Sequence, residues 1–125
     1  MPFTVRFSIS ARDDLRSIRK YIAKNDTNES ADYVAQEIIR PALTLREMPG
    51  GGARTPELLR MGIRSYGQVF FKPYRILYRI RANTVFIVLF ADGRRDMASL
   101  LARRLTELLI GNRSYGPRPG NVLLV

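Results

Sequence analysis

The 125-residue sequence contains no cysteine and no histidine. Without cysteine, the chain forms no disulfide and offers neither a thiolate nucleophile nor a thiolate metal site. Without histidine, it lacks the commonest general base and metal ligand, which excludes every Ser–His or Cys–His arrangement. The carboxylates do not cluster in the sequence, so we expect no metal site and no cofactor. Any catalysis would therefore depend on arginine, lysine, tyrosine, aspartate or glutamate.

Long apolar segments are also missing from the sequence. A membrane-spanning helix needs an apolar run of about 18 residues or more, and none occurs. Residues 1–7 lack the basic region and apolar core of a secretory signal. We therefore expect a cytoplasmic protein without membrane contact. Its hydrophobic content of 46 % suits a folded domain with its own core.

Arginine dominates what the sequence does contain. The chain has 21 basic and 11 acidic residues, a net charge of +10, and 18 of the basic residues are arginine. Residues 1–48 carry a net +1, whereas residues 49–125 carry +9. Arginine suits bidentate contacts with phosphate or carboxylate and stacks on bases. The second half is thus expected to meet nucleic acid or an acidic protein partner, unless the charge serves solubility alone.

Hydrophobic periodicity in the first half predicts a strand followed by two helices. Residues 3–9 alternate apolar and polar side chains, which is typical of a half-buried strand. Ser10 and Asp13 have the spacing of a capping box, so we expect the first helix to begin at Ala11. The second helix should cover about 29–48 as one kinked helix, because its apolar stripe stays in phase across Pro41. The two helices would form a hairpin.

The second half changes to the two-residue period of strands. Residues 49–56 are rich in glycine and favour a connector over a phosphate cradle. Strands are predicted at 61–66, with an extension over 68–71, and then at 74–81 and 84–91, the last covered on both faces. A tight turn at 82–83 would place Asn83 at positive φ. The face that carries Arg75, Arg79 and Arg81 also carries Leu77, so it should be partly covered.

A final helix should begin after Asp96, which suits an N-cap, and end at the C-cap Gly111. Its apolar stripe consists of Met97, Leu100, Leu101, Leu105, Leu108 and Leu109. The predicted order β-α-α-β-β-β-α indicates an α+β domain over residues 1–110, with an antiparallel sheet and the helical hairpin packed on it. Residues 111–125 form a tail rich in glycine, proline and arginine, either loosely ordered or adding an extended segment to a sheet edge.

Five segments, in this order, carry a resemblance to a known family; they are residues 11–22, 45–50, 62–64, 73–80 and 92–96. Over about residues 3–105 the chain resembles the ParE/RelE superfamily, the toxins of bacterial type II toxin–antitoxin modules. The resemblance implies a toxin of a plasmid-stabilisation system. It also implies a cognate antitoxin whose C-terminal segment wraps the toxin. We expect that segment to be acidic, because burying arginines without compensating charge is costly.

The superfamily divides by target. RelE-like proteins cut messenger RNA on the ribosome, whereas ParE-like proteins poison DNA gyrase. Arg75 and Arg95 match two functional arginines of RelE, and they would be the catalytic residues if the chain were a nuclease. However, Tyr66 and Gln68 stand where RelE has two lysines, and Leu101 replaces its tyrosine.

The first helix and the segment before the last helix resemble ParE more closely, through Asp13, Asp14, Tyr21 and residues 94–96. The leading hypothesis is therefore a non-enzymatic, ParE-like gyrase inhibitor. The alternatives are a ribosome-dependent endoribonuclease and a non-toxic basic domain that binds nucleic acid. The residues predicted to bind the target or the antitoxin are Arg64, Arg75, Arg79, Arg81, Arg94, Arg95 and Asp96.

Each of these residues also has a plain structural explanation. The strand arginines could simply be solvated, and Asp96 could cap its helix and pair with Arg94 or Arg95. Tyr74 and Tyr78 are better explained as the edge of the core than as site residues. The leucines of the last helix should be core, although part of the stripe could line a groove for an antitoxin helix.

Overall fold

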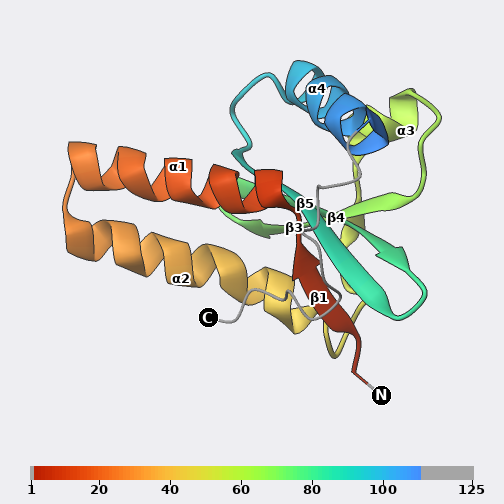
Figure 1. Ribbon diagram of the computed structural model, residues 1–125, viewed down its shortest axis with the longest axis horizontal. Coiled ribbons are helices and arrows are strands. Elements are labelled where there is room, and N and C mark those ends of the chain that lie inside the picture. The colour runs from red at the N-terminus through yellow and green to blue at the C-terminus, as the bar shows by residue number, and fades with distance from the viewer. Residues whose placement is uncertain (1, 111–125) are drawn as a thin grey trace.

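The computed structural model describes residues 2–110. The elements are β1 (Thr4–Phe7), α1 (Ile9–Asn25), α2 (Asn28–Thr44), β2 (Ala53–Arg54), α3 (Pro56–Arg60), β3 (Tyr66–Phe71), β4 (Tyr74–Arg81), β5 (Thr84–Asp92) and α4 (Met97–Ile110) (Figure 1). The predicted α+β class is confirmed, as are the helical hairpin and the C-terminal helix. The expectations for Gly111, for the tail and for the side chains of Leu108 and Leu109 lie outside the described residues.

The five strands form one sheet in the order β1-β5-β4-β3-β2. Strands β2 to β5 pair antiparallel, but β1 pairs with β5 in parallel, from Thr4 opposite Thr84 to Phe7 opposite Ile87. The sheet is therefore mixed: the prediction of an antiparallel sheet is confirmed for β2 to β5 and was wrong for β1. The first strand joins the last one after a long crossover rather than through a hairpin, which permits the parallel direction.

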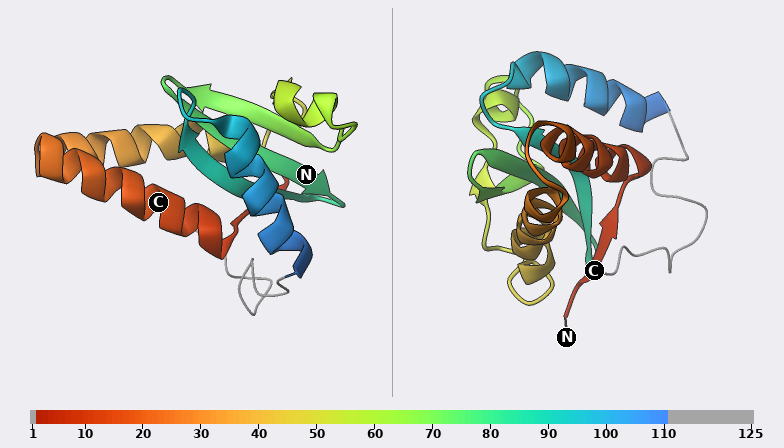
Figure 2. Two further views of the ribbon diagram at one scale, coloured as in Figure 1. Left: turned by 90° about the horizontal axis from the view of Figure 1, so that it is seen from above. Right: turned by 90° about the vertical axis from the view of Figure 1, so that its left-hand side faces the viewer.

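Helices cover both faces of the sheet. The α1–α2 hairpin packs on one face and extends beyond the sheet, whereas α3 and α4 lie on the other face (Figures 1 and 2). The buried residues under the hairpin include Phe7, Ile38, Ile76 and Ile87. Those under α3 and α4 are Leu58, Leu77, Val88, Leu89, Ala91, Met97, Leu100 and Leu101. Strand β5 contributes to both cores, as predicted for a strand that is covered on its two faces.

A β-bulge interrupts the pairing of β4 with β5. Leu77 lies opposite Leu89, but the next residue, Tyr78, lies opposite Ile87, so Val88 is the extra residue of β5. Val88 and Leu89 consequently both face the core under α3 and α4. The bulge also lies where the pairing with β1 ends.

The first helix begins two residues earlier than the capping-box pattern predicted. Ser8 is the N-cap of α1, and its side-chain oxygen accepts a hydrogen bond from the backbone N–H of Ala11 at 3.0 Å. Ser10 instead donates a hydrogen bond to Glu107 of α4 at 3.0 Å. A long-range contact therefore uses the serine that the local pattern assigned to capping.

Pro41 lies within one continuous helix, as its in-phase apolar stripe predicted, although α2 ends at Thr44 instead of residue 48. The segment between the hairpin and β3 was predicted less well. It contains β2 and α3, and β3 begins only at Tyr66. In the β4–β5 turn the positive φ of 53° belongs to Ala82 rather than to Asn83.

The glycine-rich connector packs closely against β4. A Cβ atom on Gly52 would lie 2.1 Å from the Tyr78 hydroxyl oxygen, and one on Gly67 would lie 2.7 Å from the same oxygen. Gly52 therefore allows the backbone to approach the buried Tyr78 ring. This packing role fits the connector that the composition favoured.

Candidate functional site

The strand register separates the predicted site residues into two groups. At one end of the sheet Tyr74 lies opposite Asp92, and at the other Arg81 lies opposite Thr84. We call these the Asp92 end and the Thr84 end. Arg94, Arg95 and Asp96 follow the Asp92 end directly. Arg79 and Arg81 lie toward the Thr84 end.

Arg64 also lies toward the Thr84 end, because β3 pairs with β4. It precedes β3, whose first residue, Tyr66, lies opposite Arg79. Its carbonyl oxygen accepts a hydrogen bond from Arg54 at 2.9 Å, and its side chain is exposed. The predicted residues therefore do not form one continuous site.

Arg75 belongs to neither exposed group, because it lies in a half-buried polar cluster. Its two terminal nitrogens donate to the carboxylate of Glu57 at 2.9 and 2.8 Å, and its Nε donates to Gln68 at 2.8 Å. The Arg75 side chain is only 11 % exposed. This hydrogen bonding lowers the pKa of Glu57 to about 2. Arg75 thus connects β4 to α3 and β3, and its guanidinium is already occupied.

A cleft of about 410 Å³ opens between α1 and the Asp92 end. It is lined by Asp14, Ser17, Ile18, Tyr21, Tyr74, Phe90, Ala91, Asp92, Arg94 and Arg95. Tyr21 is 69 % exposed, whereas Tyr74 is half-buried. Burial raises the pKa of Tyr74, so its phenol stays protonated at neutral pH. The cleft therefore combines two phenol rings with two arginines.

The two arginines of the cleft differ in their partners. Arg94 donates to both carboxylate oxygens of Asp92, at 2.9 and 2.5 Å, and this lowers the pKa of Asp92. The backbone N–H of Arg95 donates to the carbonyl of Asp92 at 3.1 Å, but its side chain is exposed and forms no ion pair within residues 2–110. Arg95 is consequently the cation of this cleft that is available to a ligand.

Asp96 acts on α4 rather than on the cleft. Its carboxylate accepts hydrogen bonds from the backbone N–H of Ser99 at 3.2 Å and from the Ser99 hydroxyl at 2.8 Å. These are the contacts of an N-cap, and they lower the pKa of Asp96. The capping role that the sequence offered as an alternative is therefore present.

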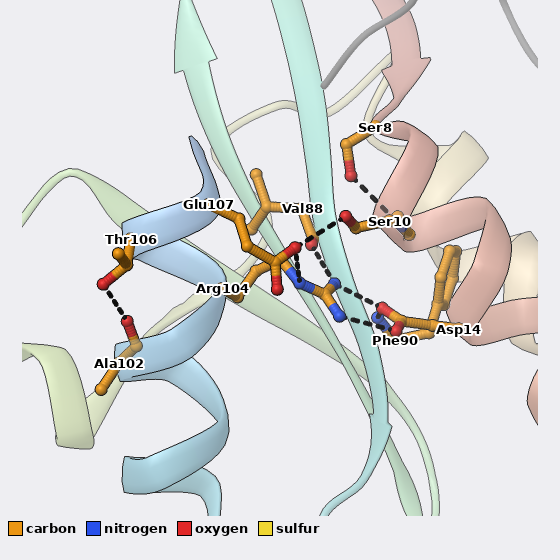
Figure 3. A network of polar contacts seen from close by, with 10 residues as sticks. Ser8, Ser10, Asp14, Val88, Phe90, Ala102, Arg104, Thr106 and Glu107 are labelled. Carbon is orange, nitrogen blue, oxygen red and sulfur yellow. Dashed lines mark hydrogen bonds and ion pairs between the residues drawn. The ribbon is translucent and has the colours of Figure 1, made fainter. Parts of the chain in front are cut away.

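A polar network that the sequence did not reveal holds α4 against α1 and β5 (Figure 3). Arg104 donates to both oxygens of Asp14, at 2.7 and 2.8 Å, and to the carbonyl of Val88 at 2.9 Å. Asp14 also accepts from the backbone N–H of Phe90 at 3.0 Å. Burial raises the pKa of Asp14, and the hydrogen bonds from Arg104 oppose that rise. Asp14 and Arg104 are 90 positions apart, so no local pattern could have paired them.

The Thr84 end presents arginines next to aromatic rings. Arg6 of β1 lies opposite Phe86 of β5, Phe86 lies opposite Arg79 of β4, and Arg79 lies opposite Tyr66 of β3. The guanidinium carbons of Arg6 and Arg79 each lie 5.9 Å from the centre of the Phe86 ring. We call Arg6, Phe86, Arg79 and Tyr66 the four-strand row. It lies on the sheet face that carries α3 and α4.

No group of three or more acidic residues in residues 2–110 could hold a metal ion. None of the helices found there combines the length and the apolar character that a membrane crossing requires.

The mixed sheet, the helical hairpin and the C-terminal helix together form the architecture expected for the ParE/RelE superfamily. A family model described as the ParE toxin of the type II toxin–antitoxin system parDE matches residues 5–97. The chain therefore belongs to the ParE toxin family.

A solved structure supports the fold. A chain of the chromosomal ParDE toxin–antitoxin system from P. aeruginosa is 16 % identical to this chain and superposes with a TM-score of 0.61. The match covers 72 % of this chain and 95 % of that one. No curated protein sequence matches the chain at a significant level.

Proposed function

We propose that this protein is the toxin of a type II toxin–antitoxin pair, and that it inhibits DNA gyrase and is neutralised by a cognate acidic antitoxin. The proposal rests on membership of the ParE family. The observation that favours a non-enzymatic toxin over a nuclease is the half-buried, bidentate pairing of Arg75 with Glu57.

The other positions of an RNA-cleaving site also argue against cleavage. RNA cleavage needs groups that activate the 2′-hydroxyl, stabilise the phosphorane and protonate the leaving oxygen. Arg75 already donates to Glu57 and Gln68, and Leu101 is 1 % exposed in the core beneath α4. A leucine in the core can neither transfer a proton nor reach a substrate. Arg95 alone of the expected pair is therefore placed to meet RNA.

The cleft at the Asp92 end suits contact with a protein. Tyr21 and Arg95 are exposed there, beside the neutral phenol of Tyr74. Tyrosine and arginine are the residues that most often dominate the binding energy of an interface. A carboxylate of gyrase or of the antitoxin would pair with Arg95, because no acidic residue within residues 2–110 forms an ion pair with it.

The experiment compares growth, supercoiling and transcript integrity after induction of the full chain. We expect growth arrest with a DNA-damage response, and the purified protein should inhibit gyrase supercoiling. Tyr21→Ala combined with Arg95→Ala should weaken inhibition at least tenfold. The matched control combines Tyr33→Ala with Arg16→Ala, which changes an exposed tyrosine and an exposed arginine on the hairpin.

Three outcomes would contradict the proposal. Supercoiling that persists at high toxin excess would exclude gyrase as the target. Cleavage of transcripts within codons on translating ribosomes would show an endoribonuclease. Harmless expression at high level without an antitoxin would show that the chain is not a toxin.

A further inference from the structure

The outer edge of β1 carries backbone groups that no other described strand pairs. β1 is the first strand in the sheet order, so it has a neighbour, β5, on one side only. The backbone N–H groups of Thr4 and Ser8 donate to carbonyl oxygens on the β5 side, each at 3.0 Å. Peptide groups of successive strand residues point to opposite sides of the strand. The N–H and C=O groups of Val5 and Phe7 therefore face away from β5.

The residue before β1 shows the same outward direction. The N–H of Phe3 donates to the carbonyl of Arg46 at 2.8 Å. Within residues 2–110, no backbone partner of this kind is found for Val5 or Phe7. These two residues are nevertheless buried, at 1 % and 0 % exposure. Buried backbone polar groups almost always have a hydrogen-bond partner, so we expect one from outside residues 2–110.

The end of α4 brings the rest of the chain close to this edge. Glu107 lies one turn before the end of α4 and accepts a hydrogen bond from Ser10 at 3.0 Å (Figure 3). Ser10 comes only three residues after Phe7, the last residue of β1. Figure 2 shows the end of α4 beside the start of α1. Residues 111–125 are thus tethered next to β1, which raises their effective concentration there above that of any separate chain.

The sequence of residues 111–125 contains one segment suited to a strand. Residues 111–121 are mostly glycine, proline and polar residues, which disfavour strands. Residues 122–125, Val-Leu-Leu-Val, are all apolar, and valine is favoured in strands. The 11 residues before them can span about 36 Å when extended. The four residues of β1 cover only about 13 Å, so the apolar segment can reach the whole edge.

We propose that residues 122–125 pair with the outer edge of β1 as a further strand of the sheet. Val5 and Phe7 supply the N–H and carbonyl groups for this pairing. The contact goes beyond the proposed function, because it needs neither gyrase nor an antitoxin. A second copy of the chain, or a strand of a partner protein, would have to compete with the tethered segment. The pairing also protects an edge that would otherwise be open to other chains.

The test compares amide hydrogen exchange, measured by NMR, in the full chain and in a variant that lacks residues 122–125. The amides of Val5 and Phe7 should be protected in the full chain and should exchange about tenfold or more faster in the variant. The amides of Thr4 and Ser8 donate on the β5 side and serve as internal controls. They should stay protected in both proteins, which separates loss of one strand from general destabilisation.

Two proline variants test whether the contact is a paired strand. Leu123→Pro and Leu124→Pro each remove one backbone N–H. In a paired strand the two N–H groups point to opposite sides, and proline is tolerated where the N–H faces solvent. One variant should therefore accelerate exchange at Val5 and Phe7 as the deletion does, and the other should do so far less. Ser114→Pro, between α4 and the apolar segment, is the matched control and should have no effect.

Several results would overturn the inference. Rapid exchange at Val5 and Phe7 in the full chain would do so, as would unchanged protection after the deletion. Equal effects of the two leucine variants would show an apolar contact without strand pairing. Protection that falls on dilution would assign the edge to a second copy, and protection that appears only with an antitoxin would assign it to that partner. If the deletion variant failed to fold, loss at Ser8 would reveal this, and the proline variants would still decide.

Discussion

The two halves of β4 carry arginines on the same face but use them differently. Arg75, in the first half, is held by the carboxylate of Glu57 and the amide oxygen of Gln68. Arg79, in the second half, lies beside the Phe86 ring, and Arg81 is exposed. The difference comes from α3, which places an acidic side chain over the first half alone. An arginine repeat along a strand therefore does not determine what each arginine does.

The largest expected difference between the two halves concerns stability. Arg75→Ala leaves the half-buried carboxylate of Glu57 without its partner, and loss of charge-assisted hydrogen bonds of this kind costs roughly 2–3 kcal/mol. Arg81→Ala, at an exposed position, should change the free energy of unfolding by less than about 0.5 kcal/mol. Urea denaturation of both variants measures the contrast. Equal effects would show that Arg75 is not a structural residue.

Lowering the pH should reduce the stability that the ion pair between Arg75, in the first half of β4, and Glu57 contributes to the fold. The pKa of Glu57 falls from its ordinary 4.5 to about 2 in the folded protein. The pair therefore contributes its full stability above pH 4.5, and this contribution is lost as the pH falls toward 2. After allowance for partial exposure, the loss is about 2 kcal/mol. Denaturation midpoints between pH 6 and pH 2 should show it, whereas Glu57→Gln should flatten this part of the profile.

The smallest effect is expected in the second half of β4. Arg79→Lys keeps the positive charge but removes the planar guanidinium that lies near Phe86. The cation–π contact should weaken, at a cost of about 0.5 kcal/mol. Thermal unfolding of this variant beside Arg81→Lys, at an exposed arginine to which residues 2–110 offer no cation–π contact, isolates that contribution. A loss as large as that of Arg75→Ala would remove the distinction between the two halves.

The sequence predicted the parts of the fold that local periodicity controls. The stripes of α1, α2 and α4 and the continuous apolar run of β5 follow directly from which side chains need burial. Short elements were missed, because the two residues of β2 and the five of α3 carry too little pattern. Their positions are determined by pairing with β3 and by packing against α4.

The candidate site was predicted less completely than the fold. The sequence identified Arg94 and Arg95, and the structure brings them together with Tyr21 at one cleft. It could not show that Arg75 is paired with an acidic residue, since the partner Glu57 lies 18 positions away in a segment without a clear pattern. The parallel pairing of β1, which brings Arg6 next to Phe86, was equally inaccessible to local reasoning.

The extra residue Val88 divides β5 into two segments of opposite phase. Before it, Val85 and Ile87 face the helical hairpin; after it, Phe90 does so, while Leu89 and Ala91 face α4. If β5 kept Val88 but alternated without the bulge, Leu89 and Ala91 would face the hairpin and Phe90 would face α4. Deleting Val88 would therefore leave a strand that alternates regularly, with Leu89 and Phe90 still in their layers, but it would remove the Val88 side chain from the core under α4 and the carbonyl that Arg104 contacts. In this protein, one departure from strict alternation determines which layer of the core each later residue of β5 enters.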